Sequence, residues 1–233
     1  ASRLSYTIWG SSPDRALMRA ADEGELNSLS KIAVQVDRML LDSRAVSHSK
    51  QFAYEWLNLG RLDNLRPSPN YFPSWNPQLA QDMRAETLAF FEEVAWKEQR
   101  PLSDLFNAQL TYLTPELAKH YGLELTTQEG LARYDVTSVP ERGGLLTQGS
   151  LLTVGGDEAS MVSRGLFILH DVLQGTVNDP PPGLDVTPVP PSPGQSHRVI
   201  AESRLKAKAC GGCHEAFEPL AFGLEKFDGL GSY

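Results

Sequence analysis

The chain has 233 residues, of which 41% are hydrophobic and 21% charged, and it carries a formal net charge of -8. This length and composition are typical of an ordinary globular protein with one large domain or two small ones. The acidic balance argues against a nucleic-acid partner, because phosphate backbones bind surfaces rich in lysine and arginine. No run of about 18 apolar residues occurs, so no membrane span is expected.

Residues 1–125 predict a bundle of helices. Ser12-Pro13-Asp14 has the composition of a helix start, with proline in the first turn and an acid beside it. Asn76-Pro77 and Thr114-Pro115 have the same character, and apolar residues follow at helical spacing. The aromatic residues of this half are interpreted as core packing, and so are its methionines, Met18, Met39 and Met83.

The remaining residues, 126–233, predict a second helical domain. It begins in a less regular stretch, roughly 124–142, which connects the two halves and contains a short strand at 132–136. Ser160 can cap one helix, and another helix is expected to start near Ser196. Between them, residues 179–193 are so rich in proline that extended polyproline geometry is favoured over helix. We expect an ordered strap here rather than a linker, because the two helices that it joins must meet around the cysteine motif that follows.

Cys210-Gly211-Gly212-Cys213-His214 fits the C-x-x-C-H pattern of covalent haem attachment. Two thiols one helical turn apart can reach the two vinyl groups of one porphyrin, and the adjacent imidazole can bind the iron. The two glycines would keep the space beneath the ring open. The sequence therefore predicts one haem c per chain, bound through Cys210 and Cys213, with His214 on the iron.

A zinc site, a redox dithiol and a pair of plain thiols account for the motif less well. A zinc site commonly needs a second cysteine pair or a histidine pair, but the chain has only 2 cysteines and its remaining histidines are scattered. A thioredoxin-like dithiol needs a strand-to-helix context, whereas the segment before Cys210 has helical character. Two plain buried thiols would leave the adjacent His214 unexplained.

The residues around the motif resemble a known family. Residues 218–231 are similar to the signature D-P-x-G-F-x-L-E-x-F-D-x-x-G of the planctomycete-type cytochrome c proteins, with Glu218 where aspartate is usual and Ala221 where glycine is usual. Residues 142–150 resemble the family's R-x-G-L-L-T-Q-G-S segment, and residues 1–14 resemble the start of the helical domain that precedes its haem domain. The resemblance implies a role as an electron-transfer module, or as the partner of a redox enzyme, in a larger multidomain protein.

Several side chains are candidates for the rest of the haem pocket. Phe217, Leu220 and Phe222 are apolar and close to the motif in sequence, so they can pack against the porphyrin and exclude water, or simply fill the core. Arg164 is the candidate for binding a haem propionate, because a guanidinium can hold a carboxylate bidentately. A solvated surface arginine is an equal alternative for Arg164.

The second iron ligand is predicted to be Met161. Met161 and His170 lie on one predicted helix at positions that face opposite ways, since a helix has about 3.6 residues per turn. Met161 is at the start of this helix, after a glycine-containing loop, from where a thioether can reach a haem edge. Apolar packing is the alternative for Met161, and His170 is the alternative ligand.

The expected fold is all-α, with a helical bundle in residues 1–125 and a cytochrome-c-like helical haem domain in residues 126–233. The expected function is that of a c-type cytochrome transferring electrons within or between exported redox proteins, with a redox protein or an adjacent domain as partner. Haem c is attached outside the cytoplasm, so we expect a mature fragment of a longer bacterial precursor, periplasmic or secreted. A haem enzyme or ligand sensor with an open iron position is the alternative.

Overall fold

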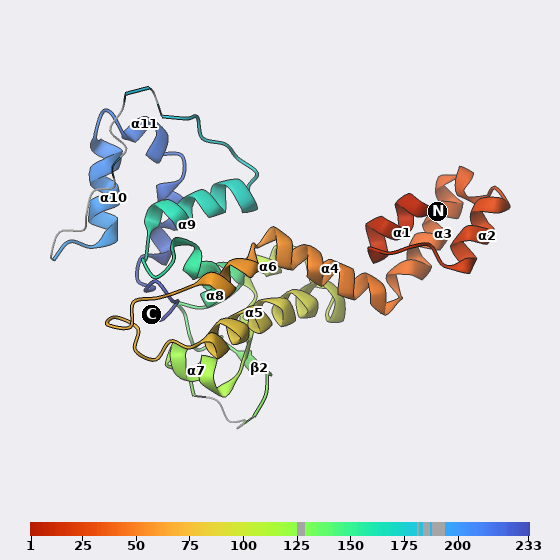
Figure 1. Cartoon of the computed structure of the whole chain (residues 1–233), viewed down its shortest axis with the longest axis horizontal. Helices are drawn as coiled ribbons and strands as arrows, with labels where there is room; N and C mark the ends of the chain where they lie inside the picture. Colours follow the sequence, from red (N-terminus) through yellow and green to blue (C-terminus); the bar gives the residue numbers. More distant parts are fainter. Residues whose placement is uncertain (125–128, 181, 184–186, 188–193) are drawn as a thin grey trace.

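The computed structural model describes residues 1–124, 129–180, 182–183, 187 and 194–233. The predicted class is confirmed at the level of a mostly helical chain, and the described residues also contain one small sheet of two strands (Figure 1). No helix in these ranges combines the length and the apolar character that crossing a membrane would need. Most of the predicted proline strap, at residues 181, 184–186 and 188–193, lies outside the described residues.

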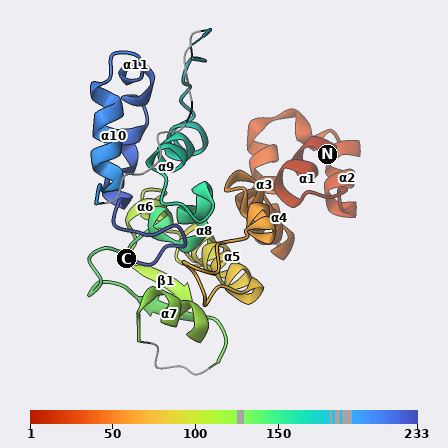
Figure 2. The ribbon, with the colours of Figure 1, turned by 60° about the vertical axis from the view of Figure 1, so that its left-hand side comes forward.

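The N-terminal helices form a small lobe at one end of the molecule (Figure 1; Figure 2). The lobe consists of α1 (Ser2–Trp9), α2 (Arg15–Asp22), α3 (Leu29–Leu40) and the start of the long helix α4 (Ser43–Trp56). Its buried core contains Trp9, Leu17, Met39 and Ala45. Asp14 caps α2 by accepting a hydrogen bond from the Leu17 amide, so the helix start predicted at Ser12-Pro13-Asp14 is confirmed.

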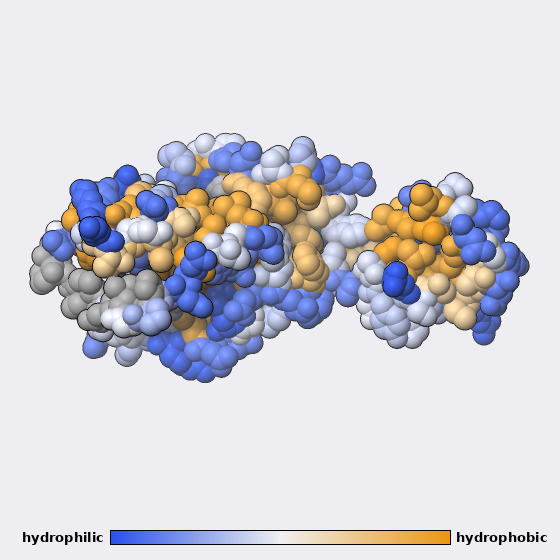
Figure 3. All heavy atoms as spheres, turned by 90° about the horizontal axis from the view of Figure 1, so that it is seen from above, coloured by the Kyte–Doolittle hydropathy of each residue, from blue (hydrophilic) through white to orange (hydrophobic). Residues whose placement is uncertain are grey.

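The same lobe exposes several large apolar side chains. Figure 3 shows apolar atoms gathered on the face of the lobe that it displays. Leu29, Val34 and Leu41 are among the exposed large apolar residues of this part of the chain. Met18 is also 46% exposed, so its predicted place in the core is wrong, because α2 buries only Leu17 and Ala20.

Helix α5 (Pro77–Glu92) is at the centre of the rest of the molecule, where it packs against α4 and, later in the chain, against β1 (Leu110–Leu113), α7 (Pro115–Tyr121) and α8 (Gly149–Leu152). The same part of the molecule contains α6 (Asp104–Asn107) and β2 (Ala132–Asp135). The two strands pair antiparallel, and β2 confirms the short strand predicted there. Asn76 and Thr114 cap α5 and α7, so both of these predicted helix starts are confirmed as well.

The chain does not fold as a bundle followed by a separate haem domain, and this part of the predicted fold is wrong. One core cluster joins Ala53 of α4 and Phe90 of α5 with Leu151 of α8, and the Arg61 guanidinium donates a hydrogen bond to the Ser150 carbonyl oxygen. Helical periodicity shows which face of a helix is apolar, but it does not show which later helix covers that face. The division of the chain into domains at residues 1–125 and 126–233 stays a prediction.

The C-terminal elements lie together beside α8 (Figure 1). They are α9 (Met161–Phe167), its π-helical continuation η6 (Ile168–Val172), α10 (His197–Lys206), α11 (Gly211–His214) and the 3₁₀ segment η7 (Glu218–Leu224). Ser160 caps α9, as predicted. The helix predicted to start near Ser196 is confirmed as α10, and Ser196 is its N-cap. Helix α9 packs along η7 and also touches α10, so elements far apart in the sequence meet around the cysteine motif.

Candidate cofactor site

The cysteine motif forms a single helical turn. Cys210 directly precedes α11, and the backbone amide of His214 donates to the Cys210 carbonyl oxygen at 3.1 Å, so both cysteines and the histidine share this turn. Both thiols are free and half-buried. Two accessible thiols and an imidazole on one turn are the arrangement that covalent haem attachment requires.

The two glycines of the motif have different surroundings. A Cβ atom on Gly211 would stand 2.4 Å from the carbonyl oxygen of Leu205, whereas a Cβ atom on Gly212 would meet nothing within 4 Å. Gly211 therefore allows α11 to lie directly against the end of α10. The expectation that the glycines keep space open beside the thiols applies to Gly212 and not to Gly211.

His214 has a buried partner that the motif by itself does not identify. Its Nδ1 atom lies 2.6 Å from Oε1 of Glu218, and the Nε atom of Arg204 lies 2.6 Å from the same oxygen. Glu218 is fully buried, and its Oε2 atom has no hydrogen-bond partner among the described residues. The four-residue spacing of His214 and Glu218 is the signal that could have indicated the pair. With Nδ1 engaged, Nε2 is the ring nitrogen left for a metal.

Arg164 is buried inside the polypeptide, with 1% of its surface exposed. Its Nε, Nη1 and Nη2 atoms make five hydrogen bonds, at 2.5–3.2 Å, to the carbonyl oxygens of Leu152, Leu224, Phe227 and Asp228. Burial lowers the pKa of the guanidinium to about 10, so it remains charged at neutral pH. An arginine has only five N–H donors, so Arg164 joins backbone segments here and has no donor left for the predicted haem propionate.

The three predicted pocket residues differ in position. Phe217 is buried, and its ring centroid lies 5.0 Å from that of His214. Phe222 is half-buried, with the Arg198 guanidinium 4.6 Å from its ring centroid. Leu220 is 39% exposed. Phe217 is therefore the one of the three that packs directly on the expected iron ligand.

Met161 and His170, the two candidates for a second iron ligand, lie at opposite ends of α9 and its π-helical continuation. Met161 is 2% exposed and packs with Ala201 of α10 and Ala221 of η7, the two elements that flank the motif. His170 is exposed. Met161 thus has the surroundings of an apolar core residue next to the motif, and its role as an iron ligand stays a prediction.

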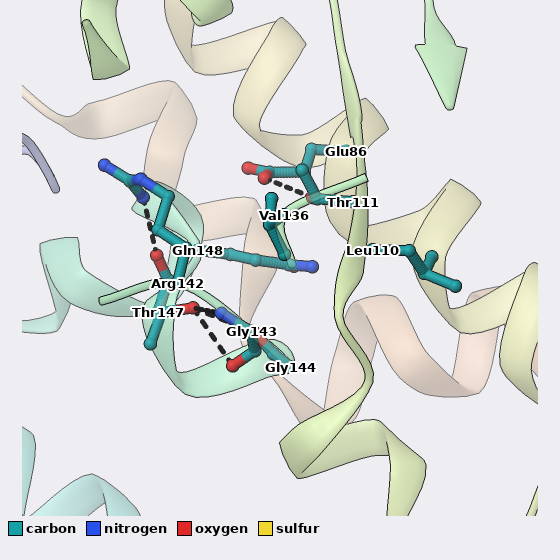
Figure 4. A pocket seen from close by; sticks show the side chains of 9 residues that line it. All are labelled: Glu86, Leu110, Thr111, Val136, Arg142, Gly143, Gly144, Thr147 and Gln148. Atoms are coloured by element: carbon teal, nitrogen blue, oxygen red, sulfur yellow. Dashed lines mark hydrogen bonds between the residues drawn. The ribbon is translucent and has the colours of Figure 1, made fainter. Parts of the chain in front are cut away.

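A second group of buried polar side chains lies between α5 and the segment before α8 (Figure 4). Glu86 of α5 is 1% exposed and accepts hydrogen bonds from the hydroxyl groups of Thr111, at 2.6 Å, and Tyr121, at 2.7 Å. Burial raises the pKa of the Glu86 carboxyl to about 7. The cavity beside it, lined also by Arg142 and Gln148, has a volume of about 10 Å³, room for one water molecule at most. This cluster therefore holds the fold together rather than a ligand.

The chain matches two family models. Residues 1–123 match PSD4, described as a protein of unknown function (DUF1592), and residues 142–233 match PSCyt3, described as a protein of unknown function (DUF1588). These two domains are found in planctomycete cytochrome c family proteins, in agreement with the resemblance of residues 218–231. Neither the curated proteins nor the solved structures include a match to the chain.

Proposed function

We propose that this chain, which belongs to the PSD4 (DUF1592) family, is a c-type cytochrome that holds one haem through Cys210 and Cys213, with His214 on the iron. Its proposed function is electron transfer within or between exported redox proteins, in the periplasm or outside the cell. The partner would be a redox protein or a neighbouring domain of a larger protein.

One observation carries this proposal. Two free, half-buried thiols share a helical turn with an imidazole whose Nδ1 atom is already engaged by Glu218. Thiols can form thioether bonds to porphyrin vinyl groups, and Nε2 of His214 is available to coordinate iron. A haem held in this way supplies a centre that gains and loses one electron.

The neighbouring residues fit such a group. Phe217 packs on the His214 ring and keeps water from that side of the ligand. Gly212 faces open space next to the thiols, where a side chain would compete with a bound ring system. Arg164 fixes the backbone from Leu224 to Asp228, which follows the segment that carries Phe222.

The test is to export the chain in a host with haem-attachment machinery and to extract it with acidified acetone. We expect the haem to stay with the polypeptide and to show the spectrum of a haem with two thioether bonds. Complete extraction of the haem would contradict the proposal. A low-spin spectrum unchanged by carbon monoxide supports electron transfer, whereas a ferrous form that binds carbon monoxide supports the alternative of a haem enzyme or ligand sensor.

A further inference from the structure

We infer that Glu218 is a positioning residue for the iron ligand His214, and that it lowers the reduction potential of the bound haem. The inference rests on the proposed haem attachment at Cys210 and Cys213. It assigns to Glu218 the task of holding the imidazole with its proton on Nδ1 and its Nε2 lone pair free for iron.

The contact between the two side chains is short and buried. Nδ1 of His214 and Oε1 of Glu218 are 2.6 Å apart, and the two residues are four positions apart in the chain. The Glu218 side chain is fully buried, whereas 25% of the His214 side chain is exposed. The carboxylate therefore contacts the ring from within the protein interior and occupies only its Nδ1 atom.

The backbone of Glu218 is held in place by α9. A Cβ atom on Gly165 would stand 2.4 Å from the Phe217 carbonyl oxygen and 3.2 Å from the Cα atom of Glu218. Only a glycine permits this approach, so the helix lies directly against the peptide that carries the carboxylate. The Cα atom that carries the Glu218 side chain is thus fixed by packing against α9.

Arg204 also holds the carboxylate. Its Nε atom donates to the same Oε1 atom at 2.6 Å, and its side chain is 18% exposed. The guanidinium compensates the buried negative charge, which would otherwise be costly. Two donors converge on Oε1, while Oε2 has no partner among the described residues. This asymmetry fixes the orientation of the carboxylate toward the imidazole.

A carboxylate acceptor affects the iron more strongly than a neutral one. Hydrogen bonds to ionised acceptors are roughly twice as strong as those between neutral groups. Donation of Nδ1–H to a carboxylate raises the basicity of Nε2 and thereby stabilises the more positive, oxidised iron. Hydrogen bonding around the ligand is one of the means by which a protein sets a haem potential, so Glu218 is expected to lower it.

The test compares Glu218→Gln with Glu215→Gln in the haem-loaded chain. Both changes remove one negative charge close to His214, but Glu215 is exposed and has no side-chain partner among the described residues. We expect the midpoint potential of E218Q to rise above that of the wild type, and that of E215Q to move much less. Equal shifts in the two variants, or no shift in E218Q, would overturn the inference while leaving covalent attachment of haem intact.

A second measurement needs no haem and separates this inference from the proposed function. The ¹⁵N chemical shifts of the His214 ring in the haem-free wild type, followed up to a pH at which the ring carries a single proton, should show that this proton is on Nδ1. A proton on Nε2 would overturn the inference even if E218Q does not fold. Loss of covalent haem from the wild-type chain would instead contradict the proposed function and leave this tautomer result unchanged.

Discussion

Gly211 lies so close to Leu205 that a Cβ atom on the glycine would stand 2.4 Å from the leucine carbonyl oxygen. This contact places the turn that carries both thiols directly against the end of α10. Gly212, the next residue, has no atom within 4 Å of such a Cβ position. The two adjacent glycines of the motif are thus the same residue type, but only Gly211 is closely packed against another helix.

Gly211→Ala is therefore expected to destabilise the haem-free chain by about 1–3 kcal/mol, because backbone must move to relieve the overlap. Gly212→Ala should leave the free energy of unfolding unchanged or raise it by up to about 1 kcal/mol, because alanine favours a helix more than glycine does and nothing obstructs its Cβ atom. Denaturant unfolding followed by circular dichroism measures both. Equal stability of the two variants would show that the contact between α10 and α11 is not tight.

Replacement of both Cys210 and Cys213 by alanine should abolish covalent haem, because no other cysteine is present in the chain. The haem content of the denatured polypeptide, compared by absorption with that of the wild type, measures the effect. A His214→Ala variant is the control, since it keeps the thiols and removes only the proposed ligand. Haem that stays attached to the denatured double-cysteine variant would refute attachment at this motif.

Met161→Leu tests the proposed second iron ligand with little disturbance of packing. Leucine replaces methionine in a core at a cost below about 1.5 kcal/mol, so the buried position of Met161 should be preserved. If the thioether binds iron, the variant should become high-spin or water-ligated and lose the weak red-edge absorption band of methionine–iron ligation. His170→Ala is the comparison, and a loss of the low-spin spectrum there instead would identify His170 as the ligand.

Arg164→Lys should destabilise the chain by at least about 2 kcal/mol, because an ammonium group has three donors and cannot reach the four carbonyl oxygens that the guanidinium joins. The exposed Arg15 provides a matched control, for which the same substitution should cost less than about 0.5 kcal/mol. Denaturation midpoints of the two variants measure the difference. A wild-type midpoint for R164K would mean that the carbonyl oxygens find other donors.

The free energy of unfolding should fall as pH rises from about 4.5 to 7 through the contribution of Glu86. Burial raises the pKa of this carboxyl from 4.5 to about 7, so the folded state binds a proton that the unfolded state has released in this window. The stabilisation from this extra proton is complete below pH 4.5, the pKa of the carboxyl in the unfolded chain. It is lost as the pH rises to the folded-state pKa of about 7, and the total loss is up to about 3 kcal/mol. This pH-dependent loss of stability should be absent from the Glu86→Gln variant.

The measurement is the difference in unfolding free energy between the wild type and E86Q from pH 4 to pH 8. Other titrating groups, such as the half-buried His120, are present in both proteins and cancel in this difference. The wild type should lose stability relative to E86Q as the pH rises. A difference that is constant over this range would show that the Glu86 carboxyl has the same pKa in the folded and unfolded chains, and would contradict the prediction.

Local signals in the sequence were sufficient for most helix starts and for the motif itself. Asn76, Thr114, Ser160 and Ser196 cap helices because a capping side chain bonds to an amide only three residues later in the same segment. The turn from Cys210 to His214 likewise depends on neighbouring residues. Such interactions do not require knowledge of how distant segments pack.

The roles of Arg164 and Glu218 depended on tertiary structure. The sequence was compatible with a solvated Arg164 or with a propionate ligand, but packing brings it to carbonyl oxygens 60 or more positions later in the chain. Glu218 is spaced for contact with His214, yet its burial comes from α9, whose Gly165 lies against its backbone. A charged side chain that packing removes from water must take its partners from whatever segments enclose it, and residue type and spacing do not specify those segments.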